Sequence, residues 1–185
     1  MINAILVFNN SGQPRLTKFY TQLTTATATL KPSLSPFSRS RRNQDTSVQQ
    51  KLISEIFALV SHRPPSACNF LPLPPLLAPP PSSTTTTTTT TTTHDDDTPS
   101  LLTYRHYATL YFILISTSTE SPLALLDLIQ VFVEALDRLF ENVCELDLIF
   151  NFETLHAVLG EMVVGGVVVE TALERVVEGV RAQGR

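Results

Sequence analysis

The stretch that decides the fold is "INAILVF", residues 2–8, which is apolar at odd and even positions alike. Side chains alternate between the two faces of a strand, so this pattern predicts a strand that is covered on both faces. The polar "NNSGQPR", residues 9–15, predicts a turn, and "RLTKFYTQL", residues 15–23, predicts a second strand. The chain therefore opens with a hairpin.

A helix is predicted next, over residues 46–62. Its apolar stripe consists of Val48, Leu52, Ile56 and Leu59. Thr46 or Ser47 can cap its start, and the pair Pro64-Pro65 ends it.

Three further strands are predicted between residues 67 and 117. The first is "ACNFL", residues 67–71. Residues 101–117, "LLTYRHYATLYFILIST", are strand-like throughout, but fully extended they would span roughly 56 Å, too long for one strand of a small domain. We therefore expect a bend near residues 106–109 and two strands.

The chain from residue 121 onwards is predicted to be mainly helical. Ser121 suits an N-cap and Pro122 the first helical position. An apolar stripe follows at Leu125, Ile129, Phe132, Leu136, Phe140 and Val143. Leu126 and Val133 fall outside this stripe, which indicates that more of the domain, a partner or a ligand covers the helix.

Two more helices are predicted towards the C-terminal end. One runs from residue 151 to 163 and stops at Gly165-Gly166, and the other opens with a capping box of Thr171 and Glu174. The order of elements predicts an α+β domain, with an antiparallel sheet of about five strands packed by helices.

Length and composition predict a single domain over residues 1–185, since 43% of the residues are apolar. Two low-complexity segments interrupt it. Residues 24–44 are basic and rich in Thr, Ser and Pro, while residues 72–100 hold a proline-rich stretch and ten consecutive threonines. Neither has a regular apolar pattern to bury, so both are expected to be disordered loops.

The charge is unevenly distributed. The net charge is −4, which gives no reason to expect nucleic acid, but residues 1–63 carry eight Lys/Arg against two acids and residues 120–185 carry twelve acids against four Arg. This indicates one face for an acidic partner or anionic membrane and another for a basic partner, with scattered solvated charge as the alternative.

Targeting and disulfide signals are weak. Cys68 and Cys144 lack the spacing of a disulfide framework or zinc site. The N-terminal apolar run is a poor signal peptide, and no stretch reaches the length of a membrane span. We expect a soluble, cytosolic chain without cofactor or metal.

Carboxylates are interleaved with apolar residues in "FENVCELDLIFNFE", residues 140–153. An acid/base pair is one interpretation, but no phosphate-binding, dinucleotide or nucleophile motif accompanies it. None of the four histidines is paired with a nearby acid at a spacing that suggests a metal site or a catalytic triad. We instead expect Asp147 to cap a helical turn, and Glu141 and Glu145 to face solvent or a basic partner. The chain is predicted not to be an enzyme.

Several segments closely resemble the small (sigma) subunits of the clathrin-adaptor family. They are "FNNSGQPRLTKFY", "YRHYATLYF", "LLDLIQVFVEALDRLFENVCELDLIFNFETLH" and "EMVVGGVVVET". The variants "LDLIQVFVE" and "YRHYATLYF" are most similar to the sigma subunit of adaptor protein complex 3. The resemblance covers residues 1–23, 45–71 and 101–181 and implies a longin-like domain.

The resemblance also implies an assembly and a location. The small subunit would bind a large adaptin of the delta type directly and would share a heterotetramer with beta and mu subunits. Such a complex sorts transmembrane cargo into vesicles travelling from Golgi or endosomes to the lysosome or vacuole. The subunit would be cytoplasmic and would reach the cytosolic face of those membranes, peripherally, through the complex.

The sequence departs from the family at both low-complexity segments. Without residues 24–44 the chain would read "FYTQLDTSVQQKLISEIF", which is continuous and family-like. A retained intron and a real basic insert are the two interpretations, and an intact-mass measurement across the junction separates them.

The family resemblance implies recognition of acidic dileucine signals, [DE]xxxL[LI]. Carried over position by position, the cation for the acid is Arg15, and the apolar hollow for the leucines comprises Ala108, Leu110, Val133, Asn142, Val143, Leu146 and Leu148. Two alternatives remain: the seven residues are plain core, or the partner adaptin alone supplies the cation. At the level of the whole protein, the alternative is a free-standing longin-type regulator of membrane fusion or of a small GTPase.

Overall fold

The computed structural model describes residues 1–21, 39–64, 66–73 and 99–184 of the chain. The loop predicted at 72–100 therefore lies almost wholly outside the described residues. The same holds for the larger part of the segment 24–44.

A five-stranded antiparallel sheet forms the centre of the molecule, in the order β2-β1-β5-β4-β3. The strands are β1 (Ile2–Asn9), β2 (Pro14–Phe19), β3 (Phe70–Pro72), β4 (Pro99–Tyr107) and β5 (Leu110–Thr117). All eight residues of β1 are buried, which confirms the strand predicted to be covered on both faces. The bend predicted near residues 106–109 is the tight turn between β4 and β5, where Tyr107 pairs with Leu110.

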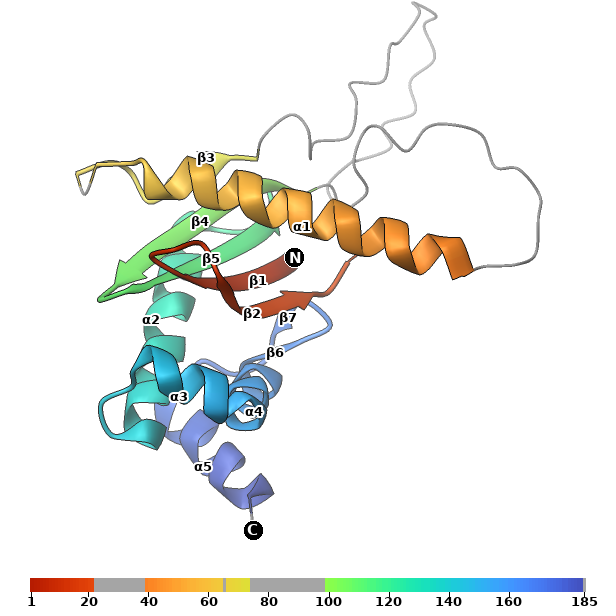
Figure 1. The fold of residues 1–185 in the computed structure, drawn as a ribbon. Helices are drawn as coiled ribbons and strands as arrows, with labels where there is room; N and C mark the ends of the chain where they lie inside the picture. The colour runs from red at the N-terminus through yellow and green to blue at the C-terminus, as the bar shows by residue number, and fades with distance from the viewer. Residues whose placement is uncertain (22–38, 65, 74–98, 185) are drawn as a thin grey trace, which may run out of the picture.

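Helix α1 (Arg39–Ser61) covers one face of the sheet (Figure 1). It packs Leu52, Ile56 and Val60 against the even-numbered side chains of β1, such as Leu6 and Phe8. The start predicted at Thr46 or Ser47 is wrong. Residues 39–45 include no proline or glycine and continue the helix back to Arg39. Leu59, predicted on the buried stripe, is 43% exposed, because Val60 completes the spacing of four.

The opposite face is covered by α2 (Pro122–Phe140) and α4 (Phe152–Met162), and α5 (Leu173–Gln183) packs against these two helices (Figure 1). The core between this face and the helices includes Ile5, Val7 and Phe112 from the sheet. Pro122 occupies the start of α2 as predicted, and Ser121 is its N-cap residue, without a side-chain cap hydrogen bond. The helix ends at Phe140, so Val143 lies in the following turn.

Three features of the C-terminal region differ from the predictions. A short helix, α3 (Glu145–Phe150), precedes α4. Gly165-Gly166 form the turn of a small hairpin, β6 (Val163–Val164) and β7 (Val167–Val168), instead of only ending a helix. The predicted capping box of Thr171 and Glu174 is absent from α5. Its N-cap residue is Ala172, and the Glu170 carboxylate accepts hydrogen bonds from the amides of Thr171 and Ala172 at 3.0 and 2.9 Å.

The β6–β7 hairpin is fastened to the first strand of the sheet. The amide of Ile2 donates to the carbonyl of Gly166 at 2.8 Å. Gly166 has φ +84°, and a Cβ there would lie 2.3 Å from the carbonyl oxygen of Ile2. Gly165 has φ +60°, but a Cβ there would meet nothing within 4 Å.

These two glycines give a matched prediction for stability. Gly165→Ala should lower the free energy of unfolding by about 1 kcal/mol, the cost of a left-handed non-glycine residue. Gly166→Ala should cost clearly more, because its Cβ also collides with backbone that is hydrogen-bonded to the hairpin. Urea unfolding of the two variants and the unmodified chain measures the difference, and equal losses would contradict the collision.

Candidate functional site

The predicted site residues come from several elements that meet where β1 ends and β5 begins. Asn9, the last residue of β1, pairs with Leu110, the first of β5. Arg15 lies at the start of the neighbouring strand β2, and α3 packs against that strand. The turn between β4 and β5 supplies Ala108. One end of the sheet therefore carries the cation and part of the predicted apolar hollow.

Arg15 is held by an ion pair with Glu145 of α3. Its Nε and Nη2 donate to the same carboxylate oxygen, Oε1, at 2.9 and 2.5 Å. Asn9 Nδ2 donates to that oxygen as well, at 3.0 Å. Gln13 Oε1 accepts from Arg15 Nη2 at 2.8 Å. One carboxylate oxygen thus accepts three hydrogen bonds from two strands.

The expectation that Glu145 faces solvent or a basic partner is therefore corrected, because its basic partner is in the same chain. Hydrogen bonds from Asn9 and then Arg15 lower the pKa of Glu145 below its ordinary value of 4.5. No sequence pattern predicts this contact, since 130 residues separate Arg15 from Glu145. Nor does any pattern predict the roles of Asn9 and Gln13, which look like ordinary turn residues.

Strained backbone surrounds the site. Among the described residues, three non-glycine residues have positive φ: Ala108 at 50°, Glu141 at 51° and Asn142 at 81°. Asp137 stabilises the turn after α2. Its carbonyl accepts from the amide of Glu141 at 2.9 Å and its carboxylate from the amide of Val143 at 3.2 Å. Such strain concentrates at ligand-binding and switching segments.

Asp147 caps α3, as predicted. Its Oδ2 accepts a hydrogen bond from the backbone amide of Cys144 at 2.9 Å. That backbone hydrogen bond is the main reason that the pKa of the Asp147 carboxyl lies below its ordinary range. The capping box leaves Cys144 exposed at the N-terminus of the helix.

The eight predicted site residues differ in accessibility. Leu110 and Leu148 are buried, at 6% and 0% exposure. Leu146 is 59% exposed. The others are either half-buried or exposed: Val133 and Val143 half-buried, Ala108 and Asn142 exposed, and Arg15 with a side chain that is 19% exposed. The expectation that Leu148 faces a ligand is not met in this conformation, because Leu148 is the buried anchor of α3.

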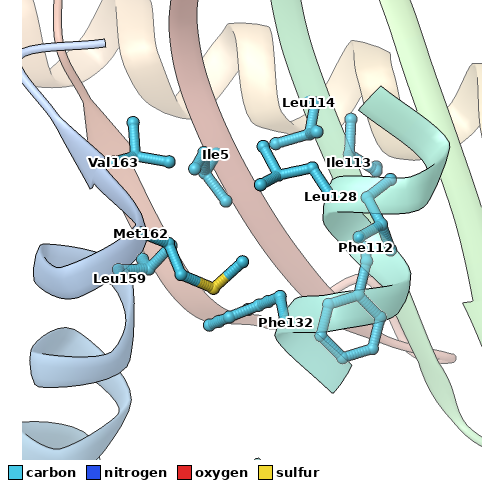
Figure 2. A pocket seen from close by; sticks show the side chains of 10 residues that line it. Ile5, Phe112, Ile113, Leu114, Leu128, Phe132, Leu159, Met162 and Val163 are labelled. Carbon is cyan, nitrogen blue, oxygen red and sulfur yellow. The ribbon is translucent and has the colours of Figure 1, made fainter. Parts of the chain in front are cut away.

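A small apolar cavity, distinct from the predicted hollow, lies between the sheet, α2 and α4 (Figure 2). Ile5, Phe132 and Met162 contribute to its wall. Its volume of about 10 Å³ is at the lower limit for one water molecule, and none of the predicted site residues lines it. It is a packing gap in the core, too small for the leucine side chains of a cargo signal.

Apolar side chains are exposed together on α3 and the start of α4. We name them the α3–α4 patch: Leu146, Ile149, Phe150 and Phe152, at 59%, 42%, 77% and 55% exposure. The sequence signal for this patch was the core-grade apolar run between residues 146 and 152, although apolar pattern alone does not tell core from interface. Exposed aromatic and aliphatic side chains gathered in this way are typical of a protein–protein contact surface.

The described part of the chain was also compared with the requirements of a metal site and of a membrane-spanning helix. No group of three His, Cys, Asp or Glu side chains gathers there as a metal site would require. No helix among the residues described is long and apolar enough to cross a membrane.

Exposed apolar side chains on α3 and α4, and an ion pair at one end of the sheet, are features that protein-binding subunits share. Residues 35–185 match the family described as "Clathrin adaptor complex small chain". The chain belongs to this family, which is a family of trafficking adaptor subunits and not of enzymes. The α+β, longin-like fold class predicted from the sequence is confirmed.

Individual relatives point to one branch of the family. The chain is 45% identical to "AP-3 complex subunit sigma" of Schizosaccharomyces pombe over 177 residues, covering 96% of this chain and 82% of that protein. It is 41% identical to the human "AP-3 complex subunit sigma-2" over 185 residues, covering 100% and 76%. It also resembles a chain of the structure "Homology model of the full-length AP-3 complex in a stretched open conformation", with a TM-score of 0.61, 38% identity and coverage of 100% and 94%.

The Arg15–Glu145 pair predicts a dependence of stability on pH. A carboxyl group whose pKa is lowered by folding stabilises the folded state above its unfolded pKa, and this contribution is lost as pH falls through the folded pKa. The unmodified chain should therefore unfold at higher urea than Glu145→Gln near pH 7, and the gap should close as pH falls below about 4.5. Parallel urea titrations from pH 7 to pH 3 measure it, and a gap that widens towards acid would refute this assignment.

Proposed function

We propose that this chain is the small subunit of an AP-3-type heterotetrameric adaptor complex, and that it contributes to recognition of acidic dileucine cargo signals. The relatives named as AP-3 sigma subunits support the assembly, since they match over nearly the whole chain. The direct partner would be a delta-type large adaptin, with beta and mu subunits completing the complex. The subunit would act peripherally on the cytosolic face of Golgi or endosomal membranes, in transport to the lysosome or vacuole.

The observation that carries the assembly is the α3–α4 patch. Phe150 alone is 77% exposed, which is costly in water and favourable once a partner covers it. A delta-type subunit that packs on this patch would bury it and hold α3 against the sheet. Such a role needs no catalytic group and stabilises the complex by apolar contact.

Assembly can be tested by substitution within the patch. Phe150→Asp should reduce co-purification with the large subunit by at least about tenfold, because a charge would enter the apolar contact. Leu123→Asp is the matched control. Leu123 is 67% exposed on the first turn of α2, outside the patch.

Co-expression and affinity capture with the large subunit give the readout. Equal loss in both variants would contradict a contact centred on the patch. An unmodified chain that purifies alone and binds a small GTPase would favour the free-standing regulator.

Signal recognition would use the end of the sheet that carries Arg15. Half-buried Val133 and Val143 offer apolar surface for two leucines, and the burial of each leucine is worth roughly 1.5–3 kcal/mol. Leu146 belongs to the α3–α4 patch, which the large subunit would cover. Arg15 offers the cation for the acid upstream. Since Leu110 and Leu148 are buried, the leucines would have to enter mainly between α2 and α3.

A peptide-binding experiment tests this proposal on the assembled pair of small and large subunits. Val133→Asp should abolish binding of an acidic dileucine peptide while the pair stays intact. Arg15→Ser should weaken the binding of peptides that carry the acid and leave the binding of peptides without it unchanged. Arg138→Ser removes an arginine from an ion pair with Glu174, away from the site, and should change neither. Unchanged binding by Val133→Asp would place the pocket elsewhere.

A further inference from the structure

We infer that Glu145 is an internal competitor for the acidic residue of the cargo signal, and so sets how strongly the site selects that acid. The inference rests on the proposed recognition of dileucine signals. It concerns a residue that is neither the cation nor part of the apolar hollow. Its basis is the set of contacts around one oxygen atom, Oε1 of Glu145.

The contacts that Arg15 offers are those that a signal carboxylate would need. Nε and Nη2 of Arg15 and the side-chain amide of Asn9 all donate to Glu145 Oε1, at 2.9, 2.5 and 3.0 Å. Charge-assisted hydrogen bonds of this kind are what guanidinium groups supply to carboxylate ligands. Glu145 therefore already occupies the position in which the signal's acid would be bound.

The Arg15–Glu145 pair is exposed enough for a signal carboxylate to replace that of Glu145. The side chains of Arg15 and Glu145 are 19% and 28% exposed, so a ligand can approach from solvent. Ion pairs near the surface contribute little net stability, because water solvates both charges well when they separate. A second carboxylate can therefore replace Glu145 at small cost, whereas a fully buried pair would resist exchange.

Displacement leaves the charge of Glu145 close by. The freed carboxylate stays on the first turn of α3, and its negative charge opposes the arriving acid. The preference for an acidic signal is then a difference between attraction to Arg15 and competition by Glu145. A site with Arg15 alone would favour the acid more strongly.

Glu145→Gln tests the inference, because the amide is nearly isosteric and its oxygen can still accept from Arg15. We expect the small–large subunit pair carrying Glu145→Gln to bind a DxxxLL peptide about two- to fivefold more tightly, the range of one exposed ion pair. Binding of the same peptide with Asn in place of the acid should not change. Glu145→Ala should shift the ratio of the affinities for the acidic and the Asn peptide in the same direction. This second variant excludes an effect that is specific to the glutamine amide.

Glu141→Gln is the matched control, since it removes one negative charge from the same segment while the contacts of Arg15 remain. It should leave the ratio of the two affinities unchanged. The gain in Glu145→Gln should also shrink as ionic strength rises, because salt screens partly exposed charges. Fluorescence anisotropy with labelled peptides gives both affinities under identical conditions.

The outcomes separate this inference from the proposed function. If the unmodified pair binds both peptides and Glu145→Gln changes neither affinity, or changes both equally, the competition is refuted while signal recognition stands. Weaker binding of the acidic peptide would show that Glu145 positions Arg15, and would equally refute competition. If neither the unmodified pair nor Glu145→Gln binds either peptide, both the inference and the proposed recognition fail.

Discussion

The burial of β1 on both faces is the constraint on which the rest of the structure depends. Every residue from Ile2 to Asn9 is buried, so the strand requires a hydrogen-bonded neighbour at each edge and an apolar layer on each face. Strands β2 and β5 supply the edges, α1 covers one face, and α2 with α4 covers the other. The β6–β7 hairpin closes the start of the strand through the amide of Ile2.

The candidate site lies where this buried strand ends. Asn9 is 7% exposed and still satisfies several partners. Its Oδ1 accepts from the amides of Ser11 and Gln13 at 3.0 and 2.8 Å, which shapes the turn, and its Nδ2 donates to Glu145. One core residue thus links the β1–β2 turn to α3. Side chains held by rigid elements in this way are better positioned than side chains on free loops.

Sequence pattern correctly predicted the elements that depend on neighbouring residues in the chain. The apolar residues at both parities of β1, the proline at the start of α2 and the acid that caps α3 each act within a few residues. The Arg15–Glu145 pair spans 130 residues, so no period or spacing reveals it. The capping box expected at Thr171 is absent because α5 begins one residue later, with Ala172 as its N-cap, and the amides of Thr171 and Ala172 donate to Glu170 instead. Family resemblance supplied the list of site residues, but not their burial: two leucines assigned to a surface hollow are core.

Helix α3 has few buried attachments to the rest of the domain. It has six residues and a single buried side chain, Leu148. Its other attachments are polar: the cap by Asp147, and the ion pair with Arg15 that water partly reaches. The turn before it is held by backbone amides that donate to Asp137, and it includes two left-handed residues. Elements with few buried apolar contacts open locally at low free energy, whereas moving β1 would disrupt both cores. The proposed site would therefore combine a fixed wall, the end of the sheet, with α3 as a wall that a bound partner could shift.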